Sequence, residues 1–109
     1  MREENILIGP VQFYNYIKDE MTEFDIMIRN SKGLHARASA KFVETVELFD
    51  AQCEISKEEM TVSGESIMGL LMLAASKGSY LKVKAWGKES VLLADAIRDL
   101  INNNFEEDS

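Results

Sequence analysis

The stretch Gly33-Leu34-His35-Ala36-Arg37-Ala38-Ser39-Ala40-Lys41 marks the point where one periodicity of the sequence gives way to another. Before it, Phe24, Ile26 and Ile28 alternate with less apolar positions, which indicates a strand with one buried face. After it, apolar residues recur at helical spacing and predict a helix from about His35. The inner stripe of that helix would be Ala38, Phe42, Val46 and Phe49. The only histidine of the chain therefore stands where a strand and a helix are joined.

The rest of the sequence continues this alternation of patterns. Strands are predicted over 51–56, at Met60 and Val62, which should point inward, and over 80–86. A short helix is predicted over 66–75, with Ser66 as a good N-cap, and a final helix after Gly87. The order is β-α-β-β-α-β-α. Because each strand alternates, the sheet should bury one face only, which favours antiparallel pairing. We expect an α+β fold: an open-faced two-layer sandwich with a four-stranded antiparallel sheet and three helices on one face.

Both ends of the chain differ from this regular part. Residues 1–21 are assigned to an N-terminal extension and residues 22–109 to the domain. Helical spacing of Phe13, Tyr14, Ile17 and Met21 fits a short amphipathic helix, although an extension that adds little to function is the preferred interpretation. The acidic tail Glu106-Glu107-Asp108-Ser109 is expected to be frayed.

Composition limits the classes of function. A chain of 109 residues suits one domain with one core. Its net charge of −7 makes a nucleic-acid partner unfavourable, because an acidic surface repels phosphate backbones. The single cysteine, Cys53, excludes an internal disulfide and fits a reducing compartment; its place in a strand predicts a buried, inert thiol. We see neither a signal peptide nor a membrane span, so we expect a cytoplasmic protein without a membrane partner.

His35 is the candidate reactive group. A neutral imidazole is nucleophilic near physiological pH, and the N–H groups and dipole at a helix N-terminus favour a bound phosphate. Arg37 could add a charge-assisted hydrogen bond. The alternative is that His35 only caps a helix and Arg37 is a solvated surface residue; the spacing alone supports both equally. Since the motif contains no metal cluster, we expect no metal and no cofactor.

Two motifs in order point to a known family. Gly33-Leu34-His35-Ala36-Arg37, followed by a helix of small residues, resembles the active-site motif of HPr, the histidine-containing phosphocarrier of the bacterial phosphotransferase system. The segment Gly64-Glu65-Ser66-Ile67-Met68-Gly69-Leu70 is similar to the regulatory-serine segment of that family. The resemblance covers roughly Glu23 to Asn104. Within the family, the sequence is similar in character to alphaproteobacterial members, including those of the nitrogen-related branch.

The resemblance implies a role for each matching residue. His35 would be phosphorylated on Nδ1, Arg37 would stabilise the phosphate, and Ser66 would be the target of HPr kinase/phosphorylase. Phosphate would come from phosphoenolpyruvate through enzyme I and leave to a IIA-type acceptor. The partner-docking residues would be Ile67, Met68 and Leu71. The chain would be a monomeric phosphocarrier with a phosphohistidine intermediate rather than a stand-alone enzyme.

Two departures from the family pattern bear on the choice of partner. Ala38 stands where many members have proline, which should do little harm because alanine is an excellent helix former. Glu44 and Glu47 stand where well-known sugar-transport members have lysines, and this change should alter partner choice. We therefore expect a regulatory phosphorelay rather than sugar transport alone. The alternatives are a regulatory binding module whose phosphorylation state selects its partners, and a structural domain.

The segment from Ile67 to Leu73 contains more apolar residues than one buried stripe requires. A fully buried helix would explain it, but Met68 and Met72 suit an adaptable surface. We expect a partly exposed apolar patch.

Overall fold

The computed structural model describes residues 21–107, and in this part of the chain the predicted order of elements is confirmed. The amphipathic helix considered for the N-terminal extension lies outside the described residues except for Met21, which instead begins a strand and pairs with Trp86. The strands are β2 (Met21–Met27), β3 (Gln52–Lys57), β4 (Met60–Ser63) and β5 (Tyr80–Trp86). The helices are α3 (Ala36–Val46), α4 (Ile67–Met72) and α5 (Ser90–Asn102), followed by the short turn η1 (Asn104–Glu106).

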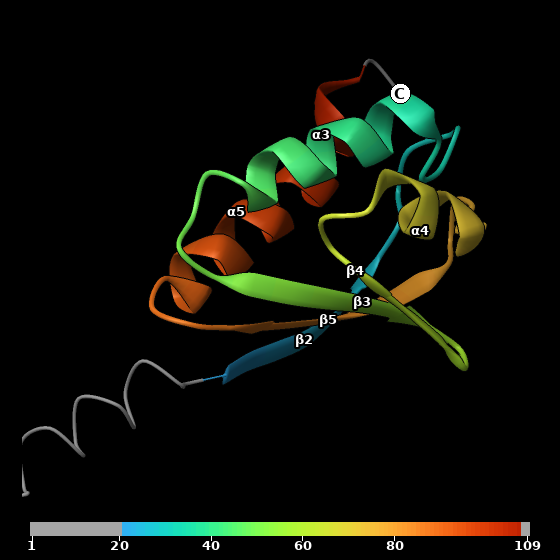
Figure 1. Ribbon diagram of the computed structural model, residues 1–109. Helices are drawn as coiled ribbons and strands as arrows, with labels where there is room; N and C mark the ends of the chain where they lie inside the picture. Colours follow the sequence, from blue (N-terminus) through green and yellow to red (C-terminus); the bar gives the residue numbers. More distant parts are fainter. Residues whose placement is uncertain (1–20, 108–109) are drawn as a thin grey trace, which may run out of the picture.

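The strands form one antiparallel sheet in the order β2-β5-β3-β4. Its register places inward-facing residues side by side: Val83 pairs with Phe24 on β2 and with Ile55 on β3. Because side chains alternate along each strand, this register collects the apolar residues on one face. All three helices cover that face, as Figure 1 shows. The predicted α+β open-faced sandwich is thus confirmed.

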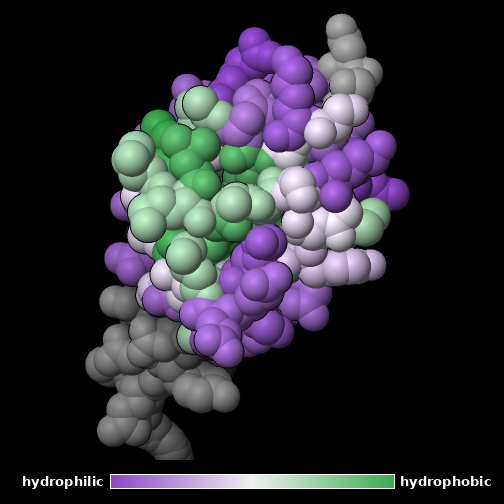
Figure 2. All heavy atoms as spheres, turned by 90° about the vertical axis from the view of Figure 1, so that its right-hand side faces the viewer, coloured by the Kyte–Doolittle hydropathy of each residue, from purple (hydrophilic) through white to green (hydrophobic). Residues whose placement is uncertain are grey.

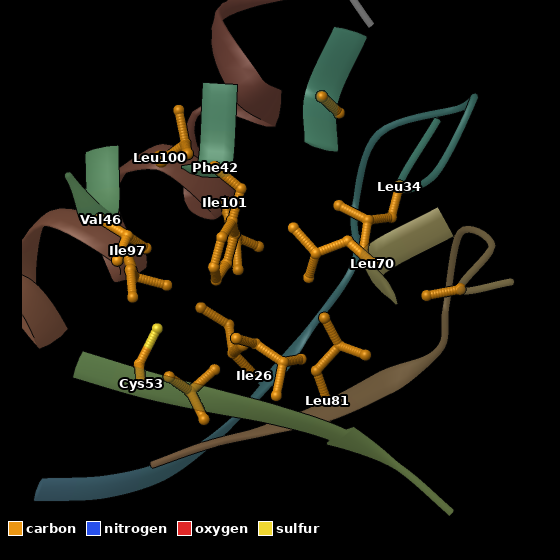
Figure 3. Close-up of a cluster of buried hydrophobic side chains, with 14 of the residues drawn as sticks. Ile26, Leu34, Phe42, Val46, Cys53, Leu70, Leu81, Ile97, Leu100 and Ile101 are labelled. Carbon is orange, nitrogen blue, oxygen red and sulfur yellow. The ribbon is translucent and has the colours of Figure 1, made fainter. Parts of the chain in front are cut away.

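The core lies between the sheet and the helices (Figure 3). Its largest fully buried side chains come from every layer: Phe42, Phe105, Ile28, Ile55, Leu70, Leu81, Leu93, Ile97 and Ile101. Cys53 lies at its margin and is 4% exposed, as predicted. Burial, with a smaller contribution from the charges of Glu65 and Glu54, raises the pKa of the Cys53 thiol to about 12. The thiol is therefore unreactive, because the thiolate is the nucleophilic form.

Two local predictions need correction. Met60 was expected to point inward but is 42% exposed, because its pairing with Lys57 places it at the turn between β3 and β4. The second helix was expected to continue to Ala75 but ends at Met72, and Ala74 then adopts a left-handed backbone with φ of 52°. This reversal lets the chain enter β5 after a short loop.

Candidate functional site

The loop that precedes the histidine is fixed by close backbone contact. Gly33 has a φ of 67°, a region that favours glycine, and a Cβ at this position would lie 2.4 Å from the carbonyl oxygen of Ala75. The next residue, Leu34, donates its N–H to that same carbonyl oxygen over 2.9 Å. The segment after α4 therefore holds the start of α3 in place.

His35 is the N-cap residue of α3 through its backbone alone. Its carbonyl oxygen accepts a hydrogen bond of 2.8 Å from the N–H of Ser39, but its side chain makes no capping hydrogen bond. The backbone is extended there, with φ of −83°, and the side chain is 23% exposed. The imidazole is thus available for chemistry, because it is not used in a hydrogen bond to the helix end.

The ring has a partner that the sequence did not reveal. Nε2 of His35 contacts a carboxylate oxygen, Oε2, of Glu107. The other carboxylate oxygen, Oε1, accepts a hydrogen bond of 3.2 Å from Nδ2 of Asn30. Both Asn30 and Glu107 lie beyond the motif that identified the histidine. The expectation that the tail frays from Glu106 onward is wrong for Glu107, because its side chain is only 11% exposed.

Glu107 is held as a carboxylate. Its partial burial acts to raise the pKa, but hydrogen bonds from His35 and Asn30, together with the charges of His35 and Arg37, bring the pKa below its ordinary value of 4.5. Asn30 is itself fully buried and also donates to the carbonyl oxygen of Gly33 over 2.8 Å. One amide therefore ties the tail to the loop that carries the histidine.

The C-terminal turn η1 places this carboxylate. Figure 1 shows the turn beside the first half of α3. Phe105 is fully buried in the core, and its carbonyl oxygen accepts a hydrogen bond of 2.9 Å from Nζ of Lys41. The same lysine lies 3.6 Å from the carboxylate of Glu106, which is largely exposed. An apolar anchor and a charged contact thus fix the turn on α3.

Two further residues were predicted for the site, Arg37 on α3 and Ser66 at the start of α4. Arg37 is exposed in the first turn of α3, and its side chain has no hydrogen-bond or ion-pair partner among residues 21–107. Ser66 is the N-cap of α4, as predicted, and its Oγ accepts a hydrogen bond of 2.9 Å from the N–H of Gly69. Since α3 packs against α4, the serine and histidine helices are neighbours.

An exposed apolar patch lies on α4. Only Leu70 of this helix is buried, whereas Ile67, Met68 and Met72 are 40%, 68% and 64% exposed. Leu71 is half-buried. Figure 2 shows apolar side chains gathered on the side of the molecule that carries α4. The expectation of partial exposure is confirmed, and Met72 belongs to this surface although it was not named as a docking residue.

Neither a metal-ligand cluster nor a membrane-spanning helix is found among the described residues. Residues 21–107 contain no group of three or more histidine, cysteine, aspartate or glutamate side chains arranged to hold a metal ion. In the same range, no helix has the length and apolar character required to cross a bilayer.

Known proteins share this sequence and architecture. The family model described as "PTS HPr component phosphorylation site" matches residues 22–103, so the chain belongs to the HPr family of phosphotransferase-system phosphocarriers. The phosphocarrier protein HPr of Xylella fastidiosa is 37% identical over 89 residues, covering 82% of this chain and all of the relative. HPr of Neisseria meningitidis serogroup A is 42% identical over 87 residues, covering 80% and 98%.

Solved structures agree with the family assignment. The crystal structure of HPr-C-His from Thermoanaerobacter tengcongensis matches with a TM-score of 0.77 and 38% identity, covering 81% of this chain and 99% of that one. HPr of Bacillus anthracis gives a TM-score of 0.72 at 29% identity, covering 76% and 99%. A dimer of the Thermoanaerobacter protein is also known, so the monomeric state expected for this chain stays a prediction.

Proposed function

We propose that the chain accepts a phosphoryl group on Nδ1 of His35 from phosphorylated enzyme I and passes it to a IIA-type acceptor. The original donor would be phosphoenolpyruvate. The observation that carries this proposal is the state of the ring: its only hydrogen-bond partner among the described residues is Glu107, at Nε2. Nδ1 is thus left without a partner in this part of the chain, at the start of a helix.

The surroundings of His35 suit a phosphorylated imidazole. The first N–H groups of α3 have no partner within the helix and can donate to phosphate oxygens, and the helix dipole favours a negative charge at this end. Arg37 is exposed two residues further on, where its guanidinium can reach the same oxygens. Acceptance and release of phosphate then require no metal and no cofactor.

The partner surface proposed for enzyme I and the acceptor is the apolar patch on α4, with Ile67, Met68 and Leu71 as contacts. Exposed methionines adapt to more than one partner, which suits a protein that must meet a donor and an acceptor in turn. Glu44 and Glu47 are exposed on α3. Their negative charge would disfavour binding of acidic acceptors, so we propose a role in a regulatory phosphorelay. We propose the cytoplasm as its location.

The exposed acidic face of α3 also supports a second candidate function. Glu44 and Glu47 would serve a regulatory binding module whose phosphorylation state, on His35 or Ser66, decides which protein it contacts. Such a module accepts phosphate but transfers none. A IIA-type acceptor added to the phosphorylated protein separates the two functions, because only a carrier loses its label to the acceptor.

The central experiment uses enzyme I and labelled phosphoenolpyruvate. Because His35 is the only histidine in the sequence, acid-labile label in the wild-type protein and none in His35→Ala would locate the phosphohistidine. Arg37→Ala should retain labelling at a reduced rate, since it removes one charge-assisted hydrogen bond. An unlabelled wild-type protein would contradict the proposal, and equal labelling of His35→Ala would place the phosphate elsewhere.

Ser66 is proposed as the regulatory target of HPr kinase/phosphorylase. A phosphate at this position would add negative charge beside the patch on α4. Ser66→Asp should therefore slow labelling of His35 while leaving the melting temperature nearly unchanged, since aspartate is also a good N-cap. Ser66→Ala is the matched control, because it loses the cap without adding charge. Equal labelling rates for the wild-type protein and Ser66→Asp would contradict this role.

A further inference from the structure

The contact between His35 and Glu107 specifies which ring nitrogen carries a proton. An ionised carboxylate can only accept hydrogen bonds, so Nε2 must be the donor. A neutral imidazole has one N–H, and Nδ1 then carries the free lone pair. We propose that Glu107 is a positioning residue: it holds His35 in the Nε2–H form, so that Nδ1 is the nucleophile, and it stabilises the positive charge that develops on the ring during transfer. This inference rests on phosphorylation of His35.

The carboxylate is held for this task from two sides. Asn30 donates to Oε1, which leaves Oε2 directed at the ring. Asn30 cannot turn away freely, because its Nδ2 also donates to the carbonyl oxygen of Gly33 and the side chain is fully buried. The geometry is that of a histidine oriented by a hydrogen-bonded carboxylate, an arrangement that keeps one tautomer in place.

The turn that delivers Glu107 is not a default conformation of the chain. Asn104, Phe105 and Glu106 have φ values of 57°, 55° and 64°, although none is glycine. Asparagine adopts left-handed backbone comparatively readily, but this conformation is unfavourable for Phe105 and Glu106, so tertiary contacts must hold the turn. Burial of Phe105 and its hydrogen bond from Lys41 supply those contacts. The turn is thus held in an unfavourable conformation that brings the Glu107 carboxylate to His35. This indicates that the contact between Glu107 and His35 is specific and not incidental.

The transfer step balances without an added base. As the bond between Nδ1 and phosphorus forms, the bond between phosphorus and the donor atom breaks, and its electron pair stays on the donor. The ring keeps its Nε2 proton and becomes cationic, which strengthens its hydrogen bond to Glu107. On release, the acceptor attacks phosphorus and the electron pair returns to Nδ1. Glu107 thus stabilises the charged ring that the first step produces, and it leaves the proton on Nε2 in both steps.

Glu107→Gln tests the inference, with Glu106→Gln as the matched control. Both remove one negative charge from the turn, but among residues 21–107 the ion-pair partner of Glu106 is Lys41 and not His35. Nitrogen NMR at about pH 9, above the range in which histidine ordinarily titrates, should show Nε2–H in the wild-type protein and in the control. A mixture of tautomers is expected in Glu107→Gln, because its amide can either donate or accept. Phosphoryl transfer should slow about fivefold to tenfold in that variant, and Glu107→Asp should recover part of the loss.

The outcomes separate this inference from the proposed function. Identical tautomer populations in the wild-type protein and both variants would overturn the role of Glu107, even if all three proteins become labelled. A mixture in Glu107→Gln with unchanged transfer rates would also overturn the part of the inference that concerns transfer. Absence of label from the wild-type protein would instead reject phosphorylation of His35, while the NMR spectra would still report whether Glu107 selects the tautomer.

Discussion

Replacing Gly33 with alanine should destabilise the protein by more than its change in side-chain size suggests. A non-glycine residue in left-handed backbone costs about 1–2 kcal/mol. The new Cβ would also lie 2.4 Å from the carbonyl oxygen of Ala75, a distance that forces the two segments apart. Separation would disrupt the hydrogen bond from Leu34 to that oxygen, which contributes about 0.5–1.5 kcal/mol. Together these effects should lower the free energy of unfolding by about 3 kcal/mol, measured by urea denaturation.

Gly78→Ala is the matched control. Gly78 also has a positive φ, of 92°, but a Cβ there would have no heavy atom within 4 Å outside its chain neighbours. Its loss should therefore stay near the backbone cost of about 1–2 kcal/mol. Losses for the two variants that agree within about 0.5 kcal/mol would refute the claim that contact with Ala75 fixes the loop before His35.

Three further predictions concern the core, the tail and the patch on α4. Cys53 should resist alkylation in the native protein at about pH 8 and react once urea unfolds it, because burial raises its pKa to about 12; rapid native reaction would contradict that burial. The stabilisation that ionised Glu107 provides should be present above pH 4.5 and disappear as the pH falls through its lowered folded-state pKa; a difference in unfolding free energy from Glu107→Gln that stays constant down to about pH 2 would argue against it. Met68→Glu should slow labelling by enzyme I about tenfold, whereas Leu92→Glu, at an exposed site on α5, should leave it unchanged.

The fold was largely predictable because its signals are local. Alternation identified the strands β2 and β5, and helical spacing identified Ala38, Phe42 and Val46 on the buried side of α3. These periods follow from backbone geometry and survive without knowledge of tertiary contacts. Met60 escaped the prediction because alternation cannot tell a strand centre from the end of a hairpin. The length of α4 was overestimated because leucine, methionine and alanine favour helix and no proline or glycine interrupts the run at Ala74.

The candidate site was only half predictable, because part of it depends on contacts between residues that are distant in the sequence. His35 and Arg37 lie together in one motif, whereas Glu107 is 72 positions away from the histidine. Nothing in an acidic tail distinguishes a glutamate that contacts a ring from one that is solvated. The left-handed turn that brings it there runs against the local preferences of Phe105 and Glu106. The one available signal was Phe105, an aromatic residue among polar neighbours, which could have indicated an anchored tail.

Assembly of the site from distant positions has a consequence for synthesis of the protein. Translation proceeds from the N-terminus, so the loop with Asn30 and His35 emerges from the ribosome long before Glu107. A chain that is still being made would have its histidine but no carboxylate to select the tautomer, and its last helix would still lack the Phe105 anchor. Full reactivity of His35 would then begin only when Phe105 and Glu107 have been added and docked beside α3.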